Sequence, residues 1–218
     1  MPRLLFEKTG NAVWISHLDL MRLFQRAFKR AGLLLTHTQG FNPRPSVSIA
    51  LPLSVGVSSD CELLDFELDG QQLSQDEIME RLNCALVSGI RVKSVYESGR
   101  KLKELALLSS RIDLYYDNGV PAGALDAVRE LFERSELTVP KKTKSGIQDQ
   151  DIISMIRSVT VAQEGNAIVL NCVGCCQNPS LNPMQLALAV SMHLPEFKPD
   201  FSSCSRIEIF DAKQRIFR

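Results

Sequence analysis

The stretch that decides the fold is residues 15–52, which read ISHLDLMRLFQRAFKRAGLLLTHTQGFNPRPSVSIALP. Apolar residues recur there every three or four positions, which is typical of an α-helix with one buried face. Ser16 is a favoured N-cap residue, and Asp19 places a carboxylate in the positive first turn. Gly32 is a frequent helix terminator. We therefore predict a helix over Ser16–Ala31, then a loop, then an apolar strand at Val47–Leu51.

The opposite face of this predicted helix is basic. Four cations fall on it, namely Arg22, Arg26, Lys29 and Arg30. Such a face can hold the phosphates of a nucleic acid. A merely solvated face is the alternative, because charge runs are common on protein surfaces.

The loop after the helix, Thr38–Pro45, is rich in groups that can form hydrogen bonds. Arg44 offers a planar fork for phosphate, and Phe41 can stack on a base as aromatic residues do in single-strand binding proteins. Gln39 and Asn42 can bind a phosphate or a base edge. The alternative is that the glycine and prolines only stiffen this connection, while Phe41 fills the core.

The composition is that of an ordinary globular protein, with 218 residues, 44% of them hydrophobic and 23% charged. This length suits two domains of about 100 residues each. No apolar run approaches the roughly 20 residues needed to span a bilayer, and Glu7 and Lys8 interrupt any signal-peptide core. We expect a cytoplasmic protein that does not enter a membrane.

A formal net charge of zero hides an asymmetry between two neighbouring segments. Residues 1–59 contain seven Lys or Arg against two acids, a net charge of +5. Residues 60–100 contain four Lys or Arg against nine acids, a net charge of −5. The first segment can therefore face a polyanion while the second supplies solubility. Two solvated faces of opposite sign are the alternative.

The order of the predicted elements indicates an α+β fold. Over residues 1–100 the order is strand, helix, strand, strand, helix, strand, which is that of a ferredoxin-like (βαββαβ) domain. The strands are expected at Arg3–Lys8 with Ala12–Ile15, at Leu33–His37 with Val47–Leu51, at Glu62–Leu68 and at Ile90–Tyr96. The second helix is expected after Ser74. We predict two tandem ferredoxin-like domains, 1–100 and 101–218, of which the second is irregular.

The second half holds one segment too many for a clean copy. Its strands are expected at Ser110–Tyr116, Leu137–Pro140, Asn166–Asn171 and Ser205–Phe210, with Ile152–Val161 undecided. Its helices are expected at Pro121–Ser135 and Pro183–His193. Lys141, Lys142 and Lys144 predict a mobile basic loop that can grip phosphates. A solvated loop is again the alternative.

His17 is the candidate catalytic residue. At the positive end of the predicted helix the dipole favours a neutral imidazole, which suits acid or base chemistry. Endonucleases that cleave CRISPR repeats also combine paired ferredoxin-like domains with a histidine, which is an analogy of fold alone. The alternative is that Ser16, His17 and Asp19 simply cap the helix.

The six cysteines of this cytosolic-looking chain do not suggest a disulfide framework. Four of them are candidates for a zinc site, namely Cys172, Cys175, Cys176 and Cys204. A CxxC pair is the usual first half of such a site, but the second half here is a single cysteine. We expect neither a metal nor a cofactor.

Two strings in the first domain resemble a known family. ISHLDLMRLFQRAFKRAGL and TQGFNPRPSVSIALPLSVGVSSDCELLDFEL are similar to the uncharacterised bacterial radical-SAM-associated proteins. Those proteins occur fused to, or encoded beside, a radical SAM enzyme with a cobalamin-binding-like domain, and related chains lie near ribonuclease E/G and ribosomal protein genes. The likeness is dense over Met1–Leu68 and returns at Asn178–Leu188. In the family Asp151-Ile152 is commonly followed by Arg-Pro, whereas here Ile153-Ser154 follows.

The resemblance implies a radical SAM partner protein and an association with RNA metabolism. The CxxxCxxC spacing of radical SAM enzymes is absent from the sequence, so the chain is not itself that enzyme. Our first hypothesis is an RNA-associated accessory module that acts with this partner in tRNA or rRNA modification or processing. The second is a metal-independent RNA-processing endonuclease, with His17 as acid or base and Arg44 stabilising the transition state. The third is a protein-only adaptor for the partner. The oligomeric state stays open.

Overall fold

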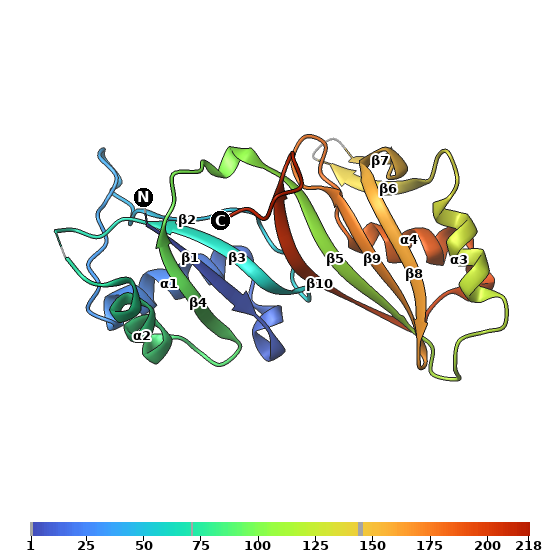
Figure 1. Cartoon of the computed structure of the whole chain (residues 1–218), viewed down its shortest axis with the longest axis horizontal. Coiled ribbons are helices and arrows are strands. Elements are labelled where there is room, and N and C mark those ends of the chain that lie inside the picture. Colours follow the sequence, from blue (N-terminus) through green and yellow to red (C-terminus); the bar gives the residue numbers. More distant parts are fainter. Residues whose placement is uncertain (1, 71, 144–145) are drawn as a thin grey trace. The chain divides into compact units, whose positions relative to one another are not determined.

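The computed structural model describes residues 2–70, 72–143 and 146–218. Its contacts divide the chain into two compact units, one of Met1–Leu102 with Arg218 and one of Lys103–Phe217. Both units combine antiparallel strands with helices, and the described residues form four α-helices in all (Figure 1). The predicted α+β class is thereby confirmed.

The first unit has the predicted order of strand, helix, two strands, helix and strand. The bounds are β1 Pro2–Lys8, α1 His17–Arg30, β2 Val47–Ile49, β3 Ser58–Phe66, α2 Gln75–Ala85 and β4 Ile90–Glu97. Its strands lie in the spatial order β4–β1–β3–β2, and each neighbouring pair is antiparallel. Helix α1 contacts α2 and β2, while α2 contacts β4. The core of the unit lies between these helices and the sheet.

Helix α1 forms as its sequence predicts. The Ser16 hydroxyl accepts a hydrogen bond from the backbone N–H of Asp19 at 3.2 Å, which caps the first turn. The apolar face is buried through Leu20, Phe24, Ala27 and Phe28. Two ring contacts join this face to the sheet, one to Phe6 of β1 with centroids 4.7 Å apart and one to Phe66 of β3 at 5.1 Å.

The strand expected at Ala12–Ile15 is wrong. Pairing of β1 ends at Lys8, and the chain turns at Gly10, whose φ is +53°. A 3-10 turn, Gly10–Trp14, follows in place of a strand. The periodicity of so short a segment carries too little information to separate the two structures.

Trp14 closes this turn and is the only tryptophan of the chain. Its ring lies against Gly56, where an added Cβ would stand 3.3 Å from the ring. The backbone N–H of Gly56 donates to the carbonyl of Val13 at 2.9 Å. About two thirds of the Trp14 side chain nevertheless stays exposed, at 67%.

The strand expected at Leu33–His37 is also wrong as a regular element. The segment makes only two isolated bridges among the described residues, Leu35 to Leu68 and His37 to Pro45. Proline has no backbone N–H to donate, so a regular ladder cannot continue through Pro45.

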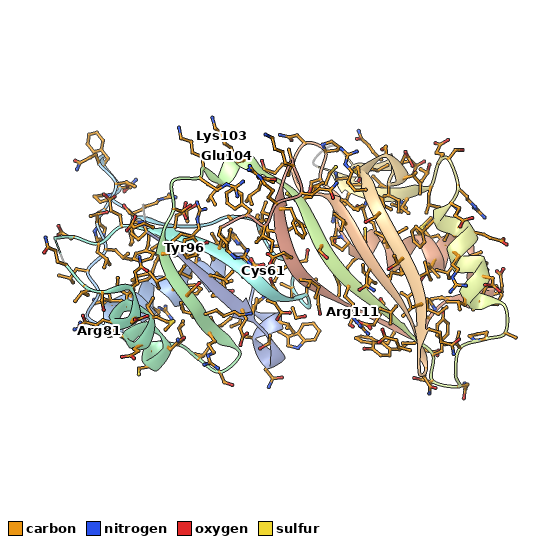
Figure 2. The ribbon with its side chains drawn as sticks, in the orientation of Figure 1. Cys61, Arg81, Tyr96, Lys103, Glu104 and Arg111 are labelled. Carbon is orange, nitrogen blue, oxygen red and sulfur yellow. The ribbon has the colours of Figure 1, made fainter. Side chains whose placement is uncertain are left out.

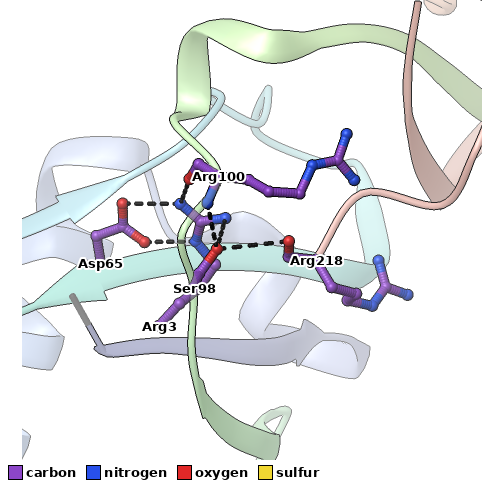
Figure 3. Close-up of polar contacts among 5 residues, drawn as sticks. All are labelled: Arg3, Asp65, Ser98, Arg100 and Arg218. Carbon is purple, nitrogen blue, oxygen red and sulfur yellow. Dashed lines mark hydrogen bonds and ion pairs between the residues drawn. The ribbon is translucent and has the colours of Figure 1, made fainter. Parts of the chain in front are cut away.

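Arg3 is buried and joins several segments of the first unit through hydrogen bonds (Figure 3). It lies on β1 and makes a two-pronged pair with Asp65 of β3, at 2.5 Å and 3.0 Å. Its guanidinium also donates to the Ser98 hydroxyl and to the Arg100 carbonyl, each at 2.9 Å. The same Ser98 hydroxyl donates to the carbonyl of Arg218 at 3.4 Å. One side chain thus ties two strands to the segment that follows β4.

The second unit repeats the order of the first around one insertion. The bounds are β5 Leu105–Tyr115, α3 Ala124–Phe132, β6 Thr138–Thr143, β7 Gly146–Asp151, β8 Ile156–Glu164, β9 Ala167–Cys175, α4 Met184–His193 and β10 Phe201–Asp211. Its main strands lie in the order β10–β5–β9–β8, again antiparallel. Helix α3 contacts β8, and α4 contacts β5 and β10. The hairpin β6–β7 pairs with itself and stands apart from this sheet.

The sequence predicted one segment too many without identifying it, and the structure shows that the extra segment is the hairpin β6–β7. The strand expected at Leu137–Pro140 corresponds to β6. Its predicted place in the main sheet is wrong, because β6 pairs with β7 in a separate two-stranded sheet. Strand β8 takes that place, and it overlaps the stretch left undecided at Ile152–Val161. In the described part of the chain, no helix has the length and apolar character required to cross a membrane.

Candidate nucleic-acid interface

The four cations predicted on α1 all lie on its exposed side. They are Arg22, Arg26, Lys29 and Arg30, and they stand opposite the buried face that carries Phe24 and Phe28. The buried face faces the core of the unit, so the helix cannot rotate without exposing its aromatic rings. The basic face is therefore held outward by the packing of the apolar one.

Two of these cations already have partners within the unit. Arg22 forms an exposed ion pair with Asp19, at 2.9 Å between Nη1 and Oδ1. Hydrogen bonds from the Ser16 hydroxyl and then from Arg22 lower the pKa of Asp19, so this carboxyl stays charged. Arg30 donates to the carbonyl of Ala85 at the end of α2. Arg22 and Arg30 are thus partly engaged in holding the helix and its neighbour.

Arg26 and Lys29 differ from those two. Neither side chain forms a hydrogen bond or an ion pair with any other residue that the structure describes. Both are exposed. Their charges are therefore available to an external anion.

The loop between α1 and β2 is closed at its base. The backbone N–H of Thr38 donates to the carbonyl of Arg44 at 2.9 Å, and the N–H of Arg44 donates to the Thr38 hydroxyl at 3.0 Å. Between them the chain turns through Gly40, whose φ of +129° suits glycine. In Figure 1 this loop extends from the body of the unit at the upper left. The closure presents residues 39–43 as one tip.

Phe41 is fully exposed at that tip, with a relative accessibility of 106%. The alternative that Phe41 fills the core is therefore wrong. Gln39, Asn42 and Arg44 are exposed as well, and the Arg44 guanidinium has no partner in the described ranges. The tip thus offers an aromatic face and two amides to solvent, and Arg44 at its base offers a guanidinium.

His17 occupies the first position of α1 and is half-buried. Its Nδ1 is buried and lacks a hydrogen-bond partner among the described residues. A general base is normally oriented by a second group that bonds to its other nitrogen. The described surroundings of His17 supply no such group.

The predicted mobile basic loop is a hairpin in the described residues. Lys141 and Lys142 lie on β6, where they pair with Gln148 and Ile147 of β7. Lys144 lies outside the described residues. Lys141 and Lys142 line a pocket of about 560 Å³ that the start of α4 completes. These lysines belong to the second unit, whereas the α1 cations and the loop tip belong to the first.

The four cysteines considered as zinc ligands are not brought together as a group of metal ligands in the described residues. Cys172, Cys176 and Cys204 are buried, while Cys175 is half-exposed. Burial raises the pKa of Cys172 and of Cys204 to about 12, and that of Cys176 to about 11. Nowhere in residues 2–70, 72–143 or 146–218 do three or more His, Cys, Asp or Glu side chains stand together as a metal site.

One polar pocket of the second unit was not predicted from the sequence. It measures about 590 Å³, and its charged lining residues are Lys103 and Arg157. Arg157 comes from β8, at a position where the pairing register with β9 shifts by one residue. Such a shift is a property of strand pairing, so the sequence around Arg157 carries no sign of it.

The solved structures that are similar to this chain include the following two. A chain in the crystal structure of a Cbf5–Nop10–Gar1 complex matches with a TM-score of 0.52 at 9% identity, over 95% of this chain and 48% of that one. This chain thus spans about half the length of the solved chain, and at that identity the likeness is one of fold alone. An unknown protein from Galdieria sulphuraria matches over 94% of this chain and 96% of that one, with a TM-score of 0.26 at 11% identity.

The family can be stated directly. No curated protein matches the sequence. Residues 2–183 match the model of the DUF2344 family, whose description is an uncharacterized protein conserved in bacteria. The predicted membership of an uncharacterised bacterial family is therefore confirmed, and the chain belongs to the DUF2344 family.

Proposed function

We propose that this protein is an RNA-associated accessory module that acts with a radical SAM partner enzyme in the modification or processing of tRNA or rRNA. The observation that carries the proposal is the fully exposed ring of Phe41 at a closed loop tip, whose base carries an Arg44 guanidinium without a partner in the described residues. Exposure of so large an apolar ring has a solvation cost, which contact with a partner surface removes. An aromatic face beside a guanidinium is the combination that single-stranded RNA stacks on.

Arg26 and Lys29 add an electrostatic component to this interface. Neither makes a hydrogen bond or an ion pair in the described part of the first unit, and both lie on the same helix that leads into the loop. Neutralising phosphates with such cations releases counterions and makes the affinity depend on salt. The loop then contributes base stacking, and the helix contributes attraction to the backbone.

The finer fold assignment belongs to the same proposal. We propose that each unit is a ferredoxin-like domain, because both place their four main strands in the same spatial order. The proposed domain boundaries are 1–100 and 101–218. The radical SAM partner rests on the resemblance of the 15–68 stretch to the associated family, and the cytoplasm is the compartment in which we expect the two to meet.

The test is RNA binding across a salt series. Fluorescent tRNA and rRNA fragments are titrated with the wild type, with Phe41→Ala, with Phe41→Leu and with Arg26→Ala/Lys29→Ala. We expect Phe41→Ala to weaken binding by about 5- to 100-fold, because stacking contributes roughly 1–3 kcal/mol per base. Phe41→Leu keeps an apolar side chain and still loses most of this contribution. The double variant lowers the slope of log K against log salt by about 2, one for each phosphate that is no longer neutralised.

The matched control is Arg91→Ala. Arg91 is exposed on β4 of the same unit and lies outside the proposed interface, so its loss changes the net charge without touching the helix or the loop. Equal weakening by Arg91→Ala and by the double variant, or no binding at low salt, contradicts the RNA proposal and leaves the protein-only adaptor. Co-purification with the radical SAM partner then tests that adaptor.

His17→Ala separates the accessory module from the endonuclease. Because His17 has no orienting partner in the described surroundings, we expect the wild type to bind RNA without cleaving it. Cleavage by the wild type that disappears in His17→Ala, with binding retained, would establish the enzyme instead.

A further inference from the structure

The second unit contains a pocket whose chemistry differs from that of the proposed RNA interface. Its volume of about 590 Å³ lies in the range of small-molecule sites. The walls come from the start of β5, from β8, from the end of β9 and from the segments that follow β9 and β10. All of its lining residues belong to the second unit.

The charged side chains of this pocket are both cations. Lys103, labelled in Figure 2 beside the start of β5, and Arg157 of β8 line it together. Neither forms a hydrogen bond or an ion pair with another residue within the described ranges. Two cations that share one pocket repel each other, so an anion placed between them relieves this repulsion.

Arg157 owes its position to an irregularity of the sheet. Ile156 is opposite Gly174 and Ser158 is opposite Val173, so Arg157 is the extra residue of a β-bulge. A bulge re-aims the side chain it carries, and bulges are frequent beside functional sites. The sheet therefore directs a guanidinium to the pocket at the point where its ladder is interrupted.

Two of the three amide side chains that line the pocket, those of Asn178 and Gln214, come from unusual backbone positions. In the described chain, only two residues other than glycine have a positive φ, and both line this pocket: Asn178 at +31° and Gln214 at +59°. Such conformations are uncommon outside glycine and cluster at functional sites. Neither side-chain amide is hydrogen bonded to another described residue.

A carboxylate fixes the turn that carries Gln214 without entering the pocket. Asp211 accepts hydrogen bonds from the backbone N–H groups of Lys213 at 2.9 Å and Arg215 at 3.0 Å. It also pairs with the Arg215 guanidinium at 2.9 Å. Asp211 does not line the pocket, so Lys103 and Arg157 are its charged lining residues.

The remaining wall is apolar. It includes Leu105, Ala106, Leu107, Pro179 and Ala212, which give the pocket an apolar side. A ligand that meets this lining needs an anionic group for the two cations, hydrogen-bonding edges for the amides and an apolar face. We propose that this pocket binds a nucleoside monophosphate, with its phosphate between Lys103 and Arg157 and its base edge on Asn178 and Gln214.

The thiol of Cys175 gives a direct readout, because it lines the pocket and is half-exposed. Alkylation by iodoacetamide is followed for each cysteine by mass spectrometry, with and without AMP. We expect AMP to slow the alkylation of Cys175 several-fold and saturably. Cys84 is exposed in the first unit and serves as the internal control, so its rate stays unchanged.

Charge variants then test the two cations. Lys103→Gln and Arg157→Gln are expected to raise the AMP concentration for half-protection by about 10-fold or more, because each removes a charge-assisted hydrogen bond. The ratio of rates with and without AMP is compared for each variant, since removal of a cation also changes the basal reactivity of the thiol. Arg134→Gln is the matched control, as Arg134 is exposed in the same unit and does not line the pocket.

Three further ligands distinguish a free nucleotide from the terminal nucleotide of an RNA. A short RNA with a 5′-phosphate, its 5′-hydroxyl counterpart and inorganic phosphate replace AMP in turn. Protection by AMP alone supports a free nucleotide, and protection that requires the 5′-phosphate of the RNA supports a terminal nucleotide. Equal protection by inorganic phosphate overturns the nucleotide assignment. No protection by any ligand, or equal weakening in Arg134→Gln, overturns the site.

The proposal of a nucleotide site in this pocket does not depend on the proposed RNA interface, and the two can be tested separately. Phe41→Ala alters the first unit alone, so it leaves the protection of Cys175 by AMP unchanged even where it abolishes binding to tRNA fragments.

Discussion

At the scale of single residues, Arg3 shows how one buried cation organises a unit. Its side chain is 2% exposed and its partner Asp65 is 13% exposed, so the pair is shielded from water. The sequence carries no sign of this, because an arginine near the start of a chain is usually solvated. Only the pairing of β1 with β3 places Arg3 opposite Asp65.

We expect Arg3→Met to lower the free energy of unfolding by about 3 kcal/mol, because it leaves the Asp65 carboxylate without its buried partner. Chemical denaturation followed by far-UV circular dichroism measures this decrease. Arg91→Met is the control and should change stability by less than about 0.5 kcal/mol, since Arg91 is exposed. A similar decrease in both variants would contradict a specific role for the Arg3–Asp65 pair.

At the scale of elements, local sequence predicted the helices better than the strands. Ser16 and Ser74 both accept hydrogen bonds from the N–H three residues on, at 3.2 Å each, as their cap positions predict. The Glu77 side chain, however, pairs with Arg81 on α2, the residue labelled in Figure 2, rather than closing a capping box. Strands depend on distant partners, which is why the predictions of regular strands near Ala12 and Leu33 were wrong.

The hairpin β6–β7 depends on one carboxylate that joins it to the next turn. Asp151 accepts hydrogen bonds from the N–H groups of Leu137 at 2.9 Å and Ile153 at 3.1 Å. The bond from Leu137 is the main cause that lowers the pKa of Asp151 below its ordinary value of 3.8. A carboxyl whose pKa is lowered by folding stabilises the fold above the unfolded pKa, and this contribution is lost as the pH falls through the folded pKa.

We therefore expect Asp151→Ala to cost about 1–2 kcal/mol at pH 7 and progressively less below pH 4. Calorimetric unfolding at pH 7 and at acidic pH measures the difference from the wild type. Asp149→Ala removes the same charge from an exposed position of the same hairpin, and its effect should be small at both pH values. A constant cost of Asp151→Ala across this range would show that the charge of the carboxyl is irrelevant.

At the scale of the whole molecule, both units use one strand order, and the sequence indicated the repeat through its alternation of elements. The candidate site could be predicted in part, since the cations and the loop are visible in the sequence whereas their partners are not. That Arg30 contacts Ala85, and that Phe41 is exposed rather than buried, follow from packing alone. The pocket around Arg157 could not be predicted, because a bulge and two turns create it.

The distribution of thiols over the molecule leads to a further prediction. Cys84 is exposed and Cys175 half-exposed, whereas the other four cysteines are buried. At pH 8 we expect these two to be alkylated in the native protein, while Cys172 and Cys204, with pKa values near 12, react only after unfolding. Mass spectrometry of the labelled protein, before and after addition of denaturant, measures the order in which the cysteines are alkylated. Early labelling of Cys204 would contradict its burial on β10.

The position of Trp14 has a spectroscopic consequence. Since it is the only tryptophan, all fluorescence excited at the red edge of the tryptophan absorption band originates in the first unit. The ring is two-thirds exposed, so its emission in the folded state already resembles that of an indole in water, and its separation from Gly56 on unfolding changes it only modestly. A melting of the second unit is silent at this wavelength, and a tryptophan placed there by substitution would report the two transitions separately.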